Sequence, residues 1–244
     1  MRSKPPDAPL EIFLLGELAL EDCLRVQRRL IYDQGDRTGG ALILCEHPPS
    51  ISIGRSGSRD HIVPDDVELH DRGIGVRWLN RGGGCILHGP GQLSAYLVMS
   101  LEGRDQDLGA YLAALNGVLL DVLAEFDLNC RISADSPGLF LRHSRIAALG
   151  VAYGRGVASH GFTLNVSPYL APFAILNEPG LDGWPLRQTS MQAERQRPTP
   201  IASVRESAIR HVESRFGLSR HHVYTDHPLI RAKARPHVHT ASLN

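Results

Sequence analysis

The segment from Arg81 to Gln92 reads RGGGCILHGPGQ and concentrates residues that suit a ligand site. Consecutive glycines are costly for stability unless the backbone must come close to another group. Without side chains, their amide N–H groups can line a cavity and donate hydrogen bonds to a carbonyl or a phosphate. Arg81 and His88 add a cation and an imidazole. A P-loop is excluded because no Gly-Lys-Ser/Thr follows; a hairpin turn between strands at 76–79 and 93–100 is the alternative.

Cysteine is the other residue type with strong chemistry of its own. Four cysteines lie far apart in the sequence, with no Cys-x-x-Cys pair: Cys23, Cys45, Cys85 and Cys130. This spacing predicts neither a disulfide framework nor a zinc site, and we expect no metal and no cofactor. The simplest role for each is that of a small buried hydrophobic residue. Cys85 stands apart because it lies in the glycine-rich segment close to His88.

Composition excludes several function classes. The 244 residues carry a formal net charge of zero, so no basic field attracts nucleic acid or anionic lipid. No apolar run reaches the roughly 18 residues that a membrane span requires. The N-terminal segment MRSKPPDAPLE lacks the apolar centre of a secretory signal. We therefore expect a cytoplasmic protein that binds neither nucleic acid nor membrane.

The elements that must position these residues follow from the apolar pattern. Strands are predicted at 10–16, 41–45, 50–54, 76–79, 93–100, 138–141, 145–153 and 156–166. Helices are predicted at 17–34, 64–73, 108–126 and 201–216. Strands, one long helix and strands again indicate an α+β fold rather than a regular βαβ alternation.

The domain boundaries are set by the two ends of this pattern. We expect a disordered N-terminus at 1–9 and a single catalytic domain at 10–218, followed by a flexible tail at 219–244. The tail is rich in histidine, containing His221, His222, His227, His237 and His239. No thiolate accompanies them, so the tail is not interpreted as a metal site.

Several segments, in order, resemble the octanoyltransferase family of the lipoate–protein ligase B type. The stretch RGGGCILHGPGQLSAYLVMSL at 81–101 is similar to the family signature RGGxxTYHGPGQ with its following apolar strand. EHPPSISIGR at 46–55 and SADSPGLFL at 133–141 resemble two further family motifs. The segment 145–180, from RIAALG to LNEPG, resembles KIAALGxxxxRGxxxHGxALNVxxDLxPFxxINPCG. The similarity covers about 40–216.

This resemblance implies a biotin/lipoate protein ligase-like fold, with a mixed sheet around an acyl tunnel and flanking helices. It implies transfer of an octanoyl group from octanoyl-acyl carrier protein to a lysine of a lipoyl domain, in lipoate biosynthesis. The acceptors would be lipoyl domains of 2-oxoacid dehydrogenases or the glycine cleavage H protein. Family members work through an acyl-thioester on a cysteine, whose pKa is lowered by a nearby lysine.

Carried over by position, the resemblance assigns substrate binding to three segments. They are Arg81, Gly82, Gly83, Gly84, Cys85, Ile86, Leu87 and His88; Ala148, Leu149 and Gly150; and Gly161, Phe162 and Thr163. Ala148, Leu149 and Phe162 suit an apolar chain, while Gly150 and Gly161 allow close approach.

Two positions depart from the family. Arg145 stands where the resemblance expects the catalytic lysine, and Pro179 where it expects the nucleophilic cysteine. Proline offers no nucleophile. Arginine keeps the positive charge but does not exchange a proton at neutral pH.

Three alternatives follow. A relocated nucleophile is Cys85, although on a strand Cys85 and His88 would point to opposite faces. Direct transfer from the activated thioester needs only orientation and a base, for which His88, His160 and Glu178 are candidates. The third alternative is a catalytically inactive homologue that binds acyl groups or lipoyl domains. An ATP-dependent ligase ranks below these, because such ligases use a lysine at position 145.

Overall fold

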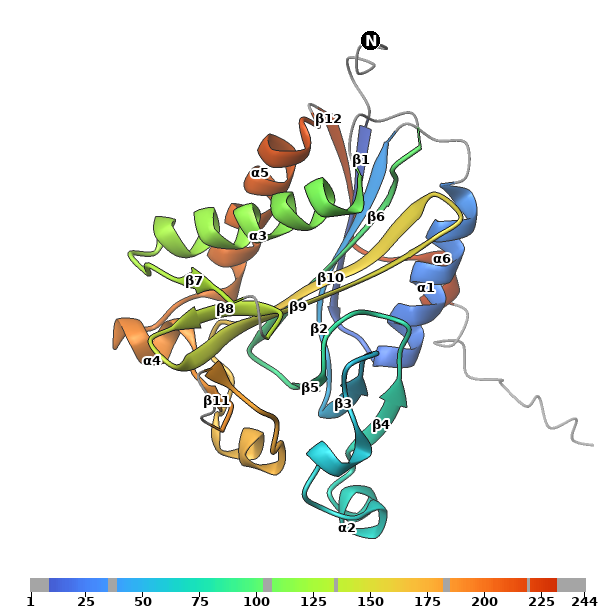
Figure 1. The fold of residues 1–244 in the computed structure, drawn as a ribbon. Helices are drawn as coiled ribbons and strands as arrows, with labels where there is room; N and C mark the ends of the chain where they lie inside the picture. Colours follow the sequence, from blue (N-terminus) through green and yellow to red (C-terminus); the bar gives the residue numbers. More distant parts are fainter. Residues whose placement is uncertain are drawn as a thin grey trace, which may run out of the picture.

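The computed structural model describes residues 9–34, 39–102, 107–133, 136–181, 185–218 and 220–231. Over these residues the chain forms two β-sheets and a set of helices (Figure 1). The large sheet contains β1 (Pro9–Glu17), β2 (Gly40–Glu46), β6 (Gln92–Ser100), β7 (Arg131–Ile132), β8 (Gly138–Leu141), β9 (Ser144–Gly154), β10 (Val157–Asn165), β11 (Arg187–Gln188) and β12 (Arg220–Tyr224). The small sheet contains β3 (Ser50–Ile53), β4 (Gly75–Trp78) and β5 (Cys85–His88).

The large sheet is mixed. Its order is β12-β1-β2-β6-β10-β9-β8-β7, and β11 pairs with β9 off this path. β1 runs parallel to β2 and to β12, and β11 runs parallel to β9. The pairs β2–β6, β6–β10, β10–β9 and β9–β8 are antiparallel. In the small sheet β3 is central, parallel to β4 and antiparallel to β5. The expected α+β fold with a mixed sheet is confirmed.

Helices cover both faces of the large sheet (Figure 1). They are α1 (Leu20–Asp33), α2 (Asp66–Asp71), α3 (Leu108–Glu125), α4 (Met191–Arg195), α5 (Ile201–Phe216) and α6 (Pro228–Arg231), with 3-10 turns η1 (Arg59–His61) and η2 (Ala171–Ile175). α3 and α5 pack together on one face, while α1 lies on the other with α6 beside it. Sequence signals set their ends: the Asp107 side chain caps the amide of Ala110, and Gly217 ends α5 with a left-handed φ of 57°.

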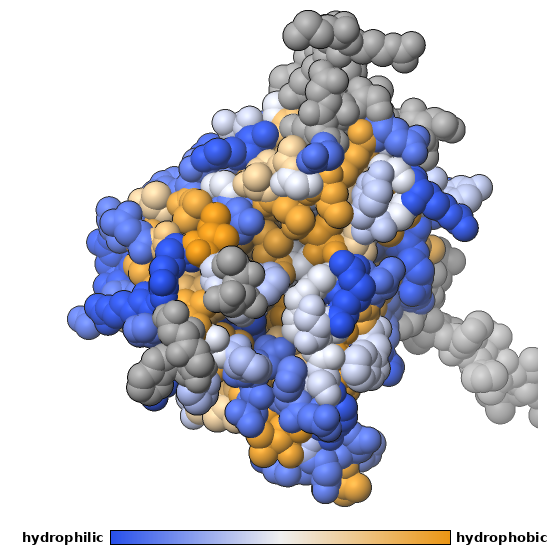
Figure 2. All heavy atoms as spheres, in the orientation of Figure 1, coloured by the Kyte–Doolittle hydropathy of each residue, from blue (hydrophilic) through white to orange (hydrophobic). Residues whose placement is uncertain are grey.

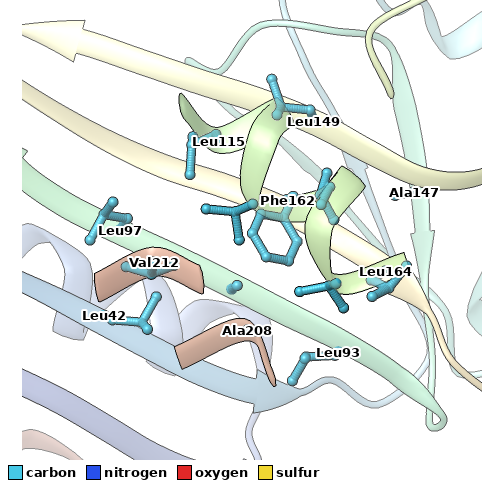
Figure 3. Packing of buried hydrophobic residues seen from close by; sticks show 14 of the residues in the cluster. Leu42, Leu93, Leu97, Leu115, Ala147, Leu149, Phe162, Leu164, Ala208 and Val212 are labelled. Atoms are coloured by element: carbon cyan, nitrogen blue, oxygen red, sulfur yellow. The ribbon is translucent and has the colours of Figure 1, made fainter. Parts of the chain in front are cut away.

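The main core lies between the large sheet and the α3–α5 pair. Figure 3 shows Phe162 of β10 among side chains from β2, β6, β9, α3 and α5. Along β10, Phe162 and Leu164 point into this core because successive strand residues alternate between the two faces. Gly161 and Thr163 therefore face the opposite side of the sheet.

A second core, on the α1 face, contains Val26 and Leu30 of α1 packed on Ile43 and Val98 of the sheet. A third core lies under the small sheet, where Ile51 and Ile53 pack on Leu69 of α2. On the face seen in Figure 1, hydrophobic residues gather in the middle of the molecule and hydrophilic ones around its edge (Figure 2).

Helix α3 is long and apolar enough, by length and composition, to cross a membrane. It is instead a core helix: Tyr111, Leu115, Val118 and Leu119 are buried in the main core. The Tyr111 hydroxyl donates to the carbonyl of Leu97 on the sheet below. Asn116, Asp121 and Glu125 interrupt the apolar residues of this helix, and its apolar character is explained by the core.

Three sequence-based expectations need correction. The hairpin alternative for the glycine-rich segment is wrong, because β4 pairs with β3 while β6 pairs with β2 and β10. The segment itself contains the strand β5, which was not predicted because the many surrounding glycines indicated a turn. The tail expected from 219 onward contains β12 and α6, since residues 220–224 pair with β1. His221, His222 and His227 lie in or beside these elements; residues 1–8, His237 and His239 lie outside the described residues.

Candidate functional site

A narrow cavity lies between the small sheet and the middle of the large sheet. Its lining residues come from both sheets and from the loop before β5: Ser52, Leu79, Arg81, Ile86, His88, Tyr96, Ala148, Gly150, His160, Gly161, Phe162 and Thr163. Its unfilled space is close to that of one water molecule, so a larger ligand enters only when wall side chains move apart.

A second small cavity adjoins the first. Ile86, Ala148 and Thr163 line both, and Arg145 lines the second together with Leu87, Gln92, Asn165, Phe173 and Gln188. The two cavities thus share one wall, with the histidines at the first cavity and Arg145 at the second.

Arg81 holds the wall of the cavity together. It is 4% exposed, and its Nη1 donates to the carbonyls of Gly82 and Gly84 at 2.9 and 3.1 Å. Its Nη2 donates to the carbonyl and the hydroxyl of Ser52 at 2.9 and 2.8 Å. Burial lowers the pKa of Arg81 to about 10, so the guanidinium stays charged at neutral pH. Because Nη1 and Nη2 both already bond the protein, Arg81 holds the glycine-rich loop against β3.

Ser52 and His88 form a buried hydrogen-bonded pair. The Ser52 Oγ lies 2.8 Å from His88 Nε2. Arg81 also donates to this oxygen, so Ser52 Oγ joins the guanidinium and the imidazole in one buried hydrogen-bonded network. Burial, and then the charges of His47 and Arg81, push the pKa of His88 well below its usual value, so the ring is neutral.

His160 is the second imidazole of the cavity, and its backbone is unusual. Its φ of 62° lies in the left-handed region that residues other than glycine seldom adopt. The pairing of β10 with β6 is interrupted at Ser159 and His160, between Ala158 opposite Met99 and Gly161 opposite Tyr96, and the register is the same on both sides. Burial lowers the pKa of His160 to about 4, and its Nδ1 has no hydrogen-bond partner. A strained backbone therefore places at the cavity a neutral imidazole whose Nδ1 is unpaired.

The glycines of the loop serve close backbone packing. A Cβ on Gly84 would lie 1.9 Å from the Glu178 Oε1, and one on Gly150 would lie 2.5 Å from the Gly82 carbonyl. The Gly82 amide donates to the Val151 carbonyl, and the Gly83 and Gly84 carbonyls accept backbone amides from the loop after β3. The expectation that glycine amides line a ligand cavity is therefore wrong for Gly82, whose amide bonds the protein.

Arg145, which lines the second cavity, meets Glu178 in the protein interior. Both side chains are buried, and Nη2 of Arg145 lies 3.8 Å from Oε2 of Glu178. The other Glu178 oxygen accepts from the Cys85 amide at 2.5 Å and lies 3.6 Å from Nδ1 of His61. Burial lowers the pKa of Arg145 while the Glu178 carboxylate raises it. The next residue, Pro179, bridges Pro185.

Cys85 lies on the opposite face of β5 from His88, as expected for a strand. It packs with Ile53 and Leu87 in the third core, and its Sγ contacts the Ser58 carbonyl at 3.5 Å. Burial, and then the Glu178 charge, raise the pKa of the Cys85 thiol to about 11. These contacts do not bring Cys85 and His88 together.

Most of the substrate-binding residues expected from sequence line the two cavities. Those that do are Arg81, Ile86, Leu87, His88, Ala148, Gly150, Gly161, Phe162 and Thr163. Leu149 instead packs in the main core, because it alternates with its neighbours along β9 (Figure 3). Four further residues of the segment do not line either cavity and lie behind its wall: Gly82, Gly83, Gly84 and Cys85.

Sequence reasoning missed Ser52, Tyr96 and His61. Ser52 carried a usable signal, because it is a polar residue between two isoleucines on a predicted strand. Tyr96 is buried in a strand whose every residue is buried, so alternation gave no signal. His61 gave no signal in the sequence, because it comes close to Glu178 only in the folded chain.

The comparisons with known proteins agree with this geometry. Residues 17–213 match the lipoyl protein ligase A/B catalytic domain. An octanoyltransferase of Geobacter metallireducens is 39% identical over 194 residues, which cover 79% of this chain and 87% of that protein. This chain belongs to the octanoyltransferase family. An octanoyltransferase of Chloroflexus aurantiacus is 32% identical, covering 86% of this chain and 95% of that one.

Solved structures place the fold. The bipartite lipoate protein ligase of Thermoplasma acidophilum superposes with a TM-score of 0.71 over 93% of this chain and 90% of that chain, at 18% identity. A biotin protein ligase from Aquifex aeolicus gives a TM-score of 0.53 over 85% and 70%, at 12% identity. The octanoyltransferase-family chain therefore has the biotin/lipoate protein ligase fold, and its family role is in lipoate biosynthesis.

Proposed function

We propose that this octanoyltransferase-family protein transfers an octanoyl group directly from acyl carrier protein to a lysine of a lipoyl domain, without an acyl-cysteine intermediate. The observation that carries this proposal is the buried pair of Arg145 and Glu178, next to Pro179. The acceptor would be a lipoyl domain of a 2-oxoacid dehydrogenase or the glycine cleavage H protein, and the reaction would take place in the cytoplasm.

Direct transfer needs little covalent help, because a thioester is already activated. The lysine attacks as the neutral amine, and the Glu178 carboxylate would accept the proton that the nitrogen loses as the C–N bond forms. As the C–N bond forms, negative charge develops on the carbonyl oxygen, where the Arg145 guanidinium supplies a fixed positive charge. The C–S bond then breaks, and the proton passes from Glu178 to the departing thiolate.

The acyl chain would run from Arg145 through the second cavity into the cavity between the sheets, with the shared wall residues moved apart. Ile86 and Ala148, which line both cavities, would offer it apolar contact. Burying an eight-carbon chain at about 0.8 kcal/mol per CH₂ stabilises the complex by roughly 5 kcal/mol. Part of this energy would be used in moving the wall side chains apart.

The contacts of Cys85 favour direct transfer over a relocated nucleophile. Its thiol is fully buried, bonds a backbone carbonyl, and is held protonated by a pKa of about 11. The thiolate is the nucleophilic form, so this environment opposes attack on a thioester.

Intact-mass spectrometry tests the proposal. A lipoyl domain is incubated with octanoyl-acyl carrier protein and this chain, beside a reaction without the chain. We expect one octanoyl group on the acceptor, formed equally by Cys85→Ser, and no octanoyl adduct on the wild-type chain itself. An adduct on Cys85 would instead support the relocated nucleophile. Acyl binding without acceptor modification would support the catalytically inactive homologue.

A further inference from the structure

Three side chains with soft or borderline metal-ligating atoms meet beneath α1, away from the Arg145–Glu178 pair. They are Cys23 of α1, Cys45 of β2 and His47 just after β2. The ligand atoms, two thiol sulfurs and one imidazole nitrogen, all lie within 4.8 Å of one another, and all three residues are buried. Both cysteines are free thiols.

The tautomer of His47 suits metal binding. Its Nδ1 lies 2.6 Å from the carbonyl oxygen of Leu18, which can only accept, so Nδ1 carries the ring proton. Nε2 is then an unprotonated acceptor, and it lies 3.7 Å from the Cys45 Sγ. In metal-binding histidines, the N–H of the second ring nitrogen typically donates a hydrogen bond to a group such as a backbone carbonyl.

The spacing is close to that of a tetrahedral site. Zn–S bonds of about 2.3 Å and Zn–N bonds of about 2.0 Å at tetrahedral angles put sulfur and nitrogen about 3.5 Å apart. The separation of 3.7 Å between Cys45 Sγ and His47 Nε2 needs little adjustment to match this value.

Gln27 supplies a fourth polar group. It is 2% exposed, its Nε2 lies 3.6 Å from the Cys23 Sγ, and its Oε1 has no hydrogen-bond partner. Turning over the terminal amide would put the unpaired oxygen near the sulfur, at the separation that two zinc ligands keep. A buried amide oxygen without a hydrogen-bond partner is unfavourable unless it gains one.

We propose that Cys23, Cys45 and His47 bind a zinc ion, with the Gln27 side-chain oxygen as the fourth ligand. Two thiolates neutralise the divalent cation, so the complex carries no net charge into the apolar second core around it. Two protons leave when the thiols become ligands. The ion ties α1 to β2, and it replaces the Tyr96 hydroxyl, 2.8 Å away, as the partner of His47 Nε2.

A second group of comparable type is less suited. His61, Cys85 and Glu178 also lie within 4.8 Å of one another. There, however, the Arg145 cation sits 3.8 Å from the carboxylate and opposes a metal ion, and Glu178 already accepts from the Cys85 amide. Cys85→Ser is therefore the matched control for the Cys23–Cys45–His47 group.

The test is metal analysis of the full chain, carrying no affinity tag and purified from zinc-supplemented medium. After dialysis against a weak chelator, we expect about one zinc per chain in the wild type and in Cys85→Ser. We expect at least a tenfold lower zinc content in Cys23→Ser and in Cys45→Ser. Wild-type protein without zinc would overturn the proposal, as would zinc kept in Cys45→Ser or lost in Cys85→Ser.

X-ray absorption at the zinc edge keeps the test decisive if a cysteine variant fails to fold, because it uses the wild-type chain alone. We expect two sulfur neighbours at about 2.3 Å and two nitrogen or oxygen neighbours at about 2.0–2.1 Å. A shell of nitrogen and oxygen only, as surface histidines would give, would overturn the proposal. Neither measurement depends on octanoyl transfer.

Discussion

The guanidinium of Arg145 lies 3.8 Å from the carboxylate of Glu178, and each side chain is more than nine-tenths buried. A buried cation and anion at this separation stabilise each other, and removing one leaves the other unpaired in a medium of low dielectric. In the proposed reaction the two residues have different roles: Glu178 accepts the amine proton, and Arg145 stabilises the developing oxyanion.

Replacing Glu178 with glutamine removes the proton acceptor while keeping the shape of the side chain. We expect the rate of octanoyl transfer to fall by about 10²-fold or more, the usual contribution of a general base. The measurement is the initial rate of acceptor modification by mass spectrometry. Glu206→Gln, on the exposed surface of α5, is the control and should transfer at the wild-type rate. An unchanged rate in Glu178→Gln would remove Glu178 from the mechanism.

Gly84→Ala should displace the Glu178 carboxylate from its present position. Its Cβ would lie 1.9 Å from Glu178 Oε1, whereas a Cβ on Gly82 meets nothing closer than 3.7 Å. We expect Gly84→Ala to lower the transfer rate about as much as Glu178→Gln, because the carboxylate must leave the Cys85 amide. Gly82→Ala is the matched control on the same loop. Equal rates in the two alanine variants would contradict this account.

Ser52→Ala should destabilise the fold. The substitution removes the hydroxyl that accepts from Arg81 and is hydrogen-bonded to His88, leaving two buried groups short of a partner. We expect a loss of about 1–3 kcal/mol in the free energy of unfolding, measured by urea denaturation. Ser56→Ala, at an exposed position, should stay within about 0.5 kcal/mol of wild type. A similar loss in both variants would show that the Ser52 network contributes little.

Two substitutions of His160 separate the effect of backbone strain from the effect of losing the imidazole. Glycine adopts a φ of 62° without strain, whereas alanine pays about 1–2 kcal/mol for this conformation. We expect His160→Gly to be more stable than His160→Ala by about 1 kcal/mol, with the imidazole missing from both. If alanine proves the more stable, the left-handed backbone at this position is not maintained in solution.

Stability should fall as the pH is lowered from neutral. Burial lowers the pKa of His160 to about 4 from an ordinary 6.5, and the pKa values of His47 and His88 are lowered as well. Between these values the unfolded chain binds more protons than the folded one, so stability present above pH 6.5 is lost as the pH falls toward 4. Each unit of pKa shift corresponds to about 1.4 kcal/mol.

Thermal unfolding between pH 7.5 and pH 4.5 measures this effect. We expect the melting temperature to fall more steeply below pH 6.5 for wild type than for His160→Gln, which lacks the titrating ring. Parallel curves for the two proteins would mean that His160 is not buried as a neutral ring.

Much of the fold was predictable because its elements are locally encoded. The apolar periodicity that predicted a helix at 108–126 corresponds to α3, whose buried stripe packs on the sheet. The strand runs that predicted β1, β2, β9 and β10 are continuous in sequence, so a local pattern was sufficient. β12 was missed because it is a short edge strand rich in histidine, and only its pairing with β1 defines it.

By itself, the sequence determined the α+β class, the resemblance to octanoyltransferases and most of the cavity residues, since these depend on motifs that are contiguous in the chain. Only the tertiary structure decided which polar groups meet. Spacing along the chain argued against a zinc site, yet the packing of α1 on β2 brings Cys23 to Cys45 and His47. Likewise, Glu178 contacts Arg145 and the Cys85 amide only because the loop after η2 folds back on β5 and β9. Side-chain chemistry acts over a few ångströms, and distance along a chain does not fix distance in space.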